Sequence, residues 1–104
     1  MAVLFDRSQL PPTALLAMSD LAALKAMAWL TARRWRVPQD VSVVGFDSVP
    51  EAALADPPLT TVEQPYRRIA ERAVAAILED ALPQGRQVLP FTLVIRKSTG
   101  PAPE

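Results

Sequence analysis

The chain has 104 residues, and its 11 basic side chains balance 11 acidic ones, so it carries no formal net charge at pH 7. This length suits one small domain rather than two. Because a neutral chain has no excess positive charge to attract phosphate groups, a free-standing nucleic-acid binder is not expected. The chain contains no Cys and no His, which excludes disulfides and thiolate metal sites and removes the commonest catalytic base. We therefore expect no enzyme activity, no metal and no cofactor.

The sequence has no segment typical of secretion or of membrane insertion. The apolar run at its start is too short for a signal peptide and reaches Asp6 and Arg7 at once. The most apolar window, residues 21–30, is interrupted by Lys25 and is too short to span a bilayer. These features favour a cytoplasmic protein that makes no membrane contact.

The first predicted unit is a strand followed by a helix. Residues 13–18 form an apolar run after two prolines, which predicts a fully buried strand. Ser19 is a favourable N-cap and Asp20 places negative charge in a first helical turn, so a helix is expected over residues 20–34. Residues 21–30 of this helix are apolar all round the axis except at Lys25. Such a pattern indicates either a central core helix of one subunit or a helix with the sheet on one side and a partner on another.

A second strand and a short helix are predicted next. Residues 41–46, with the sequence VSVVGF, are predicted to form a buried strand that ends at Asp47. Because the carboxyl ends of strands in open α/β sheets face the ligand crevice, Asp47 is a candidate binding residue. The alternative is that Asp47 caps a turn together with Ser48. Residues 49–55 are predicted to form one or two helical turns, and residues 13–58 a βαβ core with a right-handed crossover between parallel strands.

The rest of the chain is predicted to contain a crossover strand, a helix and a last strand. Residues 59–64 are predicted to form the crossover strand, and residues 65–82 an amphipathic helix that begins at a proline. Residues 87–99 are predicted to contain the C-terminal strand, and the tail 100–104 is expected to be disordered. We predict that residues 1–104 form a single fragment of an α/β domain.

Four polar side chains follow the ends of the predicted strands. Ser19 follows the first strand, Asp47 follows the second, and Gln64 and Tyr66 follow the third. Carboxylate, amide and hydroxyl groups beside an aromatic ring suit a neutral polyol or a nucleobase. No His supports any Ser as a nucleophile, and no spacing selects a pair of carboxylates. We therefore interpret the four residues as a binding set rather than a catalytic one.

A dense sequence pattern runs through the middle of the chain. It has the form VP-x-D-V-S-V-V-G-[FY]-D…P-x-L-T-T-[VI]-x-Q and is met by Val37, Pro38, residues 40–47 and residues 57–64. With this pattern the chain resembles the effector-binding core of bacterial LacI/GalR-type transcription repressors. The resemblance extends upstream to residues 12–14 and 19–20 and downstream to residues 89–90, 93–94 and 96–99.

The resemblance implies a fold and roles for the four polar residues. The fold would be a partial periplasmic-binding-protein-like (Rossmann-like) three-layer sandwich with a mostly parallel sheet. Ser19 stands where family members often have Asn, Asp47 is a usual effector contact, and Tyr66 occupies the aromatic effector position. Gln64 matches the family as well. All four are therefore expected to bind the effector.

The chain departs from the family at the end of its first helix. Family members often carry Gly at the positions of Lys25 and Arg34. A left-handed cap is harder to form with Arg than with Gly. We therefore expect this helix to run on toward Trp35 before Pro38 ends it.

The resemblance also implies what the chain lacks and what it contacts. The chain resembles only the final third of such repressors, so the DNA-binding region and the other subdomain are absent, and no direct nucleic-acid contact is expected. In the family, the helix at residues 65–82 packs on that other subdomain, and residues 20–34 and 49–55 form the subunit interface. We expect a homodimer, formed by a two-fold contact or by exchange of the C-terminal helix and strand.

The functional hypothesis follows from the binding set and the resemblance together. The chain is interpreted as the C-terminal effector-binding and dimerisation portion of a LacI-family transcriptional regulator that senses a small molecule such as a sugar or a nucleobase. One alternative is a fragment of a periplasmic-type sugar-binding protein with the same fold. Another is a stand-alone oligomerisation module.

Overall fold

The computed structural model of the chain describes residues 1, 4–6, 10–79 and 85–104. Its elements are β1 (Ala14–Leu16), α1 (Asp20–Ala32), β2 (Ser42–Phe46), α2 (Pro50–Leu54), β3 (Thr60–Glu63), α3 (Tyr66–Leu78) and β4 (Thr92–Val94). This order confirms the predicted α/β class. The last three residues of the helix predicted over 65–82 lie outside the described residues.

The four strands form one sheet in the order β1-β2-β3-β4. The β1–β2 and β2–β3 pairs are parallel and the β3–β4 pair is antiparallel, which confirms a mostly parallel sheet. The prediction that the first strand is fully buried is wrong, because β1 is an edge strand with helix on one side only. Its Leu15 packs toward the core, whereas Leu16 is 74% exposed. An apolar run does not reveal whether a strand is central or at an edge.

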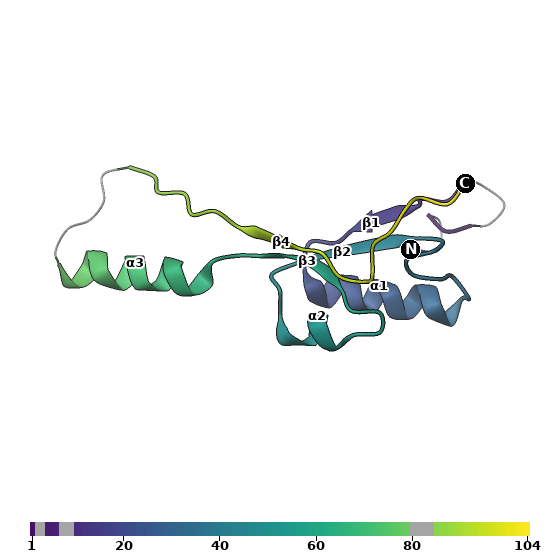
Figure 1. Cartoon of the computed structure of the whole chain (residues 1–104), viewed down its shortest axis with the longest axis horizontal. Helices are drawn as coiled ribbons and strands as arrows, with labels where there is room; N and C mark the ends of the chain where they lie inside the picture. Colours follow the sequence, from purple (N-terminus) through teal and green to yellow (C-terminus); the bar gives the residue numbers. More distant parts are fainter. Residues whose placement is uncertain (2–3, 7–9, 80–84) are drawn as a thin grey trace.

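The core lies between the sheet and the helices α1 and α2, which cover the same face (Figure 1). Its buried apolar residues are Phe5, Ala23, Met27, Leu30, Val41, Val43, Ala52 and Leu59. On the opposite face, Leu16 lies beside Val44, and Val62 lies beside Leu93, because paired residues of neighbouring strands share a face. Leu16 and Leu93 are exposed there. The described residues therefore supply two of the three layers that the fold class implies.

The end of α1 differs from the expectation that the helix runs on toward Trp35. The helix ends at Ala32, and Arg34 adopts the left-handed conformation with a φ of 64°. The Arg34 amide donates to the Thr31 carbonyl and the Trp35 amide to the Leu30 carbonyl, each at 3.0 Å. This pair of bonds is the Schellman arrangement, which satisfies the last helical carbonyls. Together with the packing of Trp35, it offsets the roughly 1–2 kcal/mol that a side chain costs in this conformation.

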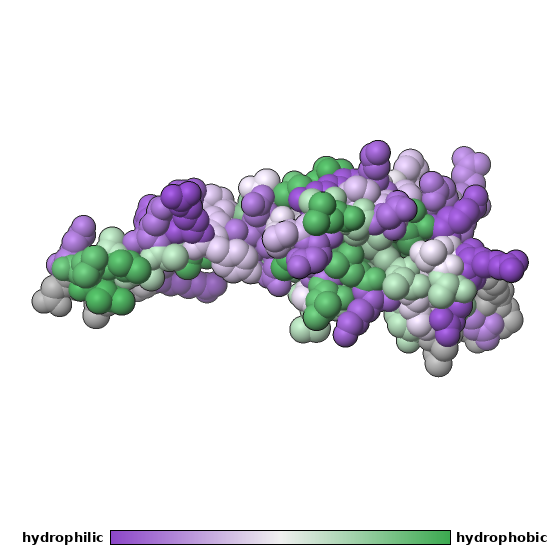
Figure 2. Space-filling model, turned by 90° about the horizontal axis from the view of Figure 1, so that it is seen from below, coloured by the Kyte–Doolittle hydropathy of each residue, from purple (hydrophilic) through white to green (hydrophobic). Residues whose placement is uncertain are grey.

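Helix α3 projects away from the rest of the molecule (Figure 1). The chain measures 60 × 26 × 22 Å, and its radius of gyration of 17.8 Å far exceeds the value of about 13 Å for a compact chain of this length. No residue of α3 is buried, and Ile77 is 72% exposed. Hydrophobic atoms gather near the far end of this projection (Figure 2). The amphipathic helix therefore does not fold back on its own sheet.

The C-terminal strand is shorter than the predicted range of residues 87–99. Only Thr92–Val94 pairs with β3, because β3 itself is short. The chain then passes the starts of β2 and β3, where Ser98 is fully buried. The Ser98 hydroxyl donates to the Val43 carbonyl at 2.6 Å and accepts from the Thr60 amide at 2.8 Å. This hydroxyl joins the starts of two neighbouring strands.

The tail over residues 100–104 was expected to be disordered, but its first residue, Gly100, is hydrogen-bonded to the sheet. The Gly100 amide donates to the Ser42 hydroxyl at 3.1 Å, which ties the start of the tail to β2. The remaining tail residues are exposed and have no regular secondary structure.

Replacing Ser98 by Ala is expected to destabilise the chain by about 1–3 kcal/mol, because the buried Thr60 amide loses its acceptor. Urea unfolding followed by circular dichroism measures this change. The matched control is Ser42→Ala, which removes only the exposed hydroxyl bonded to Gly100. A shift no larger for Ser98→Ala than for this control would contradict the assignment.

Candidate functional site

The turn after β2 has an unusual backbone conformation. Asp47 and Ser48 have positive φ angles of 113° and 60°, a region that residues other than Gly rarely adopt. The Asp47 amide donates to the Val62 carbonyl at 2.9 Å, and the Ser48 amide donates to the Thr61 hydroxyl at 3.3 Å. These bonds hold the turn against β3, at the carboxyl edge of the parallel strands.

Three of the four predicted site residues come together at this edge. Asp47 Oδ1 accepts from the Tyr66 hydroxyl at 2.6 Å and from Gln64 Nε2 at 3.2 Å. Gln64 Nε2 also lies 2.9 Å from the Tyr66 hydroxyl oxygen, to which it donates. We call these three residues the Asp47 cluster. Tyr66 is 52% exposed, whereas Asp47 and Gln64 are half-buried.

The fourth predicted residue, Ser19, has a local role in the structure. Its side chain accepts from the Ala22 amide at 3.2 Å and so caps the N-terminus of α1, as the sequence predicts. Its effector contact stays a prediction.

The Asp47 carboxylate changes the acidity of its tyrosine neighbour. Its hydrogen bond with the Tyr66 hydroxyl raises the pKa of Tyr66 above the ordinary value of 10.0, because ionisation would remove the donated proton. Loss of hydration and the negative charges of Asp47 and Asp20 raise this pKa further. At neutral pH the phenol is therefore protonated, and it donates to Asp47.

Sequence reasoning missed the structural importance of Asp20. We expected its charge to favour the helix N-terminus, but the side chain is fully buried and bonded to two other segments. The one local signal was Gly45 inside a predicted strand, since a strand glycine often marks a close approach. A Cβ atom at Gly45 would lie 2.2 Å from Asp20 Oδ1.

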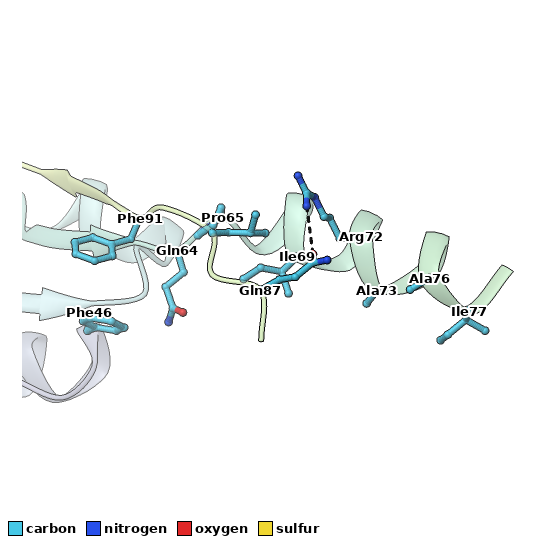
Figure 3. A pocket seen from close by; sticks show the side chains of 11 residues that line it. Phe46, Gln64, Pro65, Ile69, Arg72, Ala73, Ala76, Ile77, Gln87 and Phe91 are labelled. Atoms are coloured by element: carbon cyan, nitrogen blue, oxygen red, sulfur yellow. Dashed lines mark hydrogen bonds between the residues drawn. The ribbon is translucent and has the colours of Figure 1, made fainter. Parts of the chain in front are cut away.

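A groove of about 570 Å³ opens beside the Asp47 cluster, between α3 and the chain that returns from it (Figure 3). Its lining is mostly apolar, with Phe46 and Phe91 at one end and Ile77 at the other. Arg72 donates to Gln87 Oε1 across it at 3.2 Å. Gln64 belongs to both the groove and the cluster. The groove has the character of an uncovered packing surface, whereas the cluster supplies groups for polar recognition.

The described residues hold no group of three or more acidic side chains that could bind a metal ion. None of their helices is long and apolar enough to cross a membrane.

A hydrogen-bonding cluster at the carboxyl edge of a mostly parallel sheet is the arrangement expected in an α/β ligand-binding domain. A family model described as periplasmic binding protein-like domain matches residues 2–99. The chain belongs to this family. It is 36% identical over 107 residues to the HTH-type transcriptional repressor CytR of Escherichia coli K12, covering 99% of this chain and 31% of that protein.

Solved structures agree with the sequence match. The lac repressor dimer bound to operator has a TM-score of 0.78 at 38% identity, over 85% of this chain and 32% of that chain. A LacI family regulator from Lactobacillus casei with bound sucrose has a TM-score of 0.75 at 34% identity, over 85% of this chain and 34% of that chain. These matches confirm the resemblance to LacI-type repressors. The similar proteins are repressors rather than enzymes, which supports the prediction of no enzyme activity.

The chain spans only part of its relatives. It covers 31% of the length of CytR and 20% of the length of the HTH-type transcriptional repressor PurR of Aliivibrio fischeri.

Removing the Asp47 charge is expected to lower the pKa of Tyr66. The chain has a single Tyr, so absorbance of the phenolate during a pH titration reports this residue alone. The unaltered chain should titrate above 10.0, and Asp47→Asn should titrate closer to that value. Glu63→Gln is the control, because it removes a nearby exposed carboxylate, whereas the negative charges that raise the pKa of Tyr66 are those of Asp47 and Asp20. Equal midpoints for the unaltered chain and Asp47→Asn would contradict the hydrogen bond.

Proposed function

We propose that the chain is the C-terminal effector-binding and dimerisation portion of a LacI-family transcriptional regulator. The effector is a small neutral molecule such as a sugar or a nucleobase. The observation that carries the proposal is the Asp47 cluster, in which residues from the ends of two parallel strands meet at the sheet edge. The DNA contacts of the regulator are made outside this chain, and the protein is cytoplasmic.

The geometry of the cluster supports recognition by hydrogen bonds. Asp47 Oδ1 already accepts from Gln64 and Tyr66, which orients the carboxylate. The second carboxylate oxygen is an acceptor for a ligand hydroxyl or amino group, and the exposed Tyr66 ring offers an apolar face for stacking. The sucrose bound to the Lactobacillus casei relative is a ligand of this chemical class. Ser19 is assigned to the same ligand by its place after β1.

The surface of α1 and α2 supports a dimer. Leu54 on α2 is 83% exposed, and Leu21 on α1 is exposed as well. Between the two helices lies a shallow groove lined by Leu24, Met27, Ala28, Thr31, Ala32, Ala55 and Asp56. Contiguous apolar surface of this kind marks a protein contact. We assign it to a second copy of the chain, and exchange of α3 and β4 between copies is the alternative form of the dimer.

The proposal is tested with the gene and the longer protein it encodes. DNA upstream of the Met1 codon should encode a helix-turn-helix in the same reading frame. In that longer protein, calorimetric titration with a panel of sugars and nucleobases should find an effector, and Asp47→Ala should weaken its binding by about tenfold or more, as loss of a charged hydrogen bond does.

Two results would count against a regulator. A secretory leader upstream would favour the periplasmic-type sugar-binding protein. A true start at Met1 with neither segment would favour the stand-alone oligomerisation module.

The matched variant for the effector titration is Asp47→Asn. It keeps the shape of the side chain but replaces a carboxylate oxygen, which accepts hydrogen bonds, by an amide nitrogen, which donates them.

The chain is expected to associate in solution. Sedimentation equilibrium at micromolar concentration should find a species heavier than the 11.3 kDa chain. Leu54→Glu should shift it to monomer, because a charge on a buried apolar contact is unfavourable. The control is Leu78→Glu on α3, whose side chain is similarly exposed. Dissociation by Leu78→Glu alone would indicate exchange of α3 instead, and a monomeric unaltered chain would exclude both forms.

A further inference from the structure

The Asp20 carboxylate is buried beside the Asp47 cluster but is not part of it. It belongs to the first turn of α1 and has no solvent exposure. Its Oδ2 accepts from the Val49 amide at 2.8 Å, and its Oδ1 accepts from the Thr61 hydroxyl. One side chain therefore joins α1 to the turn after β2 and to β3. Burying a carboxylate costs free energy unless it is hydrogen-bonded, and these two bonds satisfy both of its oxygens.

Thr61 extends this connection to the turn that bears Asp47. Its hydroxyl oxygen donates to Asp20 and accepts from the Ser48 amide at 3.3 Å. The Val49 amide donates directly to Asp20. The two amides that follow Asp47 in the chain are thus both held, one by Asp20 and the other by Thr61. Asp20 therefore acts on the position of Asp47 through Thr61 and the backbone of the turn, whereas its charge acts on Tyr66 directly.

The turn needs this support because of its backbone conformation. Asp47 and Ser48 both have positive φ, and neither is Gly. Consecutive residues in this region are strained and persist only where surrounding contacts hold them. The bonds to Asp20 and Thr61 are contacts of that kind. Without them the turn can relax, and the Asp47 carboxylate then leaves the position from which it contacts Tyr66.

The sequence makes room for the Asp20 side chain at one position. Asp20 reaches β3 by passing over Gly45 in β2, where a Cβ atom would lie 2.2 Å from Oδ1. Gly45 is therefore required by the close approach of the carboxylate, and its own backbone φ is not positive. Asp20, Gly45 and Thr61 therefore form one contact unit that joins α1, β2 and β3.

We propose that Asp20 is a positioning residue for the effector site: through Thr61 and the amides of Ser48 and Val49, it fixes the strained turn that presents Asp47. This inference rests on the proposed function only in taking Asp47 as an effector contact. The positioning itself is a property of the ligand-free chain and is tested without an effector. Because Val49 leads directly into α2, the same unit also sets the start of the helix assigned to the dimer surface.

The test uses the single tyrosine as a reporter of where Asp47 lies. Thr61→Val removes the hydroxyl that joins Asp20 to the Ser48 amide but leaves both carboxylates in the chain. If the turn relaxes, the phenol loses its carboxylate partner, and the titration midpoint of Tyr66 moves down toward that of Asp47→Asn. Asp20→Asn should move it in the same direction. Thr61→Val is the cleaner variant, because the Asp20 charge itself also raises the pKa of Tyr66.

Two controls separate positioning from general destabilisation. Thr60→Val makes the same chemical change in the adjacent buried residue, whose hydroxyl pairs with Thr99 and the Arg96 amide instead. It should lower stability without moving the Tyr66 midpoint. Thr61→Ser keeps the hydroxyl and should restore the midpoint of the unaltered chain. A folded Thr61→Val chain with an unchanged midpoint would overturn the proposal, as would an equal shift in Thr60→Val.

Amide hydrogen exchange keeps the proposal testable if Thr61→Val does not fold. In the unaltered chain, the Val49 amide should exchange about 100-fold or more slowly than the tail amide of Ala102, because it is hydrogen-bonded to the buried Asp20 carboxylate in a partly buried position. Exchange of Val49 at the rate of the tail would overturn the proposal. Failure to find any effector for the longer protein would leave these two readouts unchanged, so the two proposals fail separately.

Discussion

A sheet of parallel strands needs cover on both faces, and the described residues of this chain cover one. Helices α1 and α2 bury one face, while Leu16 and Leu93 remain exposed on the other. The apolar face of the amphipathic helix α3 is also uncovered, since none of its residues is buried. The total accessible surface of 7694 Å² is well above the roughly 5,700 Å² of a compact chain of this mass. Both surfaces require a further layer of polypeptide, from the same protein or from another copy.

The order and type of the elements could be predicted because local signals agree with the fold. Ser19 caps α1, and the β-branched run before Asp47 forms the central strand β2. The exposure of β1 and the end of α1 could not be predicted, because both depend on distant neighbours. A strand lies at the edge of a sheet when no further strand pairs with its other side, and the sequence of the strand itself does not show this. The left-handed Arg34 is tolerated because Trp35 packs against Phe5, with ring centroids 5.6 Å apart.

The candidate site was predictable in part for a related reason. The carboxyl ends of the strands in a parallel sheet lie at one edge, which is why Asp47, Gln64 and Tyr66 could be predicted to lie together. The role of Asp20 was hidden, because an acidic residue in a first helical turn has an adequate local explanation. Its burial arises only when α1 crosses β2 at Gly45. Contacts of this kind depend on how the whole domain packs, so the residues next to Asp20 in the sequence do not reveal them.

The ladder between β3 and β4 has a mechanical consequence. Among the described residues, this short antiparallel ribbon is the structural link between the sheet and the projecting α3, with Thr61 opposite Val94 at its inner end. A long arm on a narrow base acts as a lever, so a small rotation of the ribbon becomes a large displacement at the tip of α3 (Figure 1). Thr61, at the inner end of this ribbon, also supports the turn of Asp47 by accepting from the Ser48 amide, so the arm and the candidate site are joined at one residue.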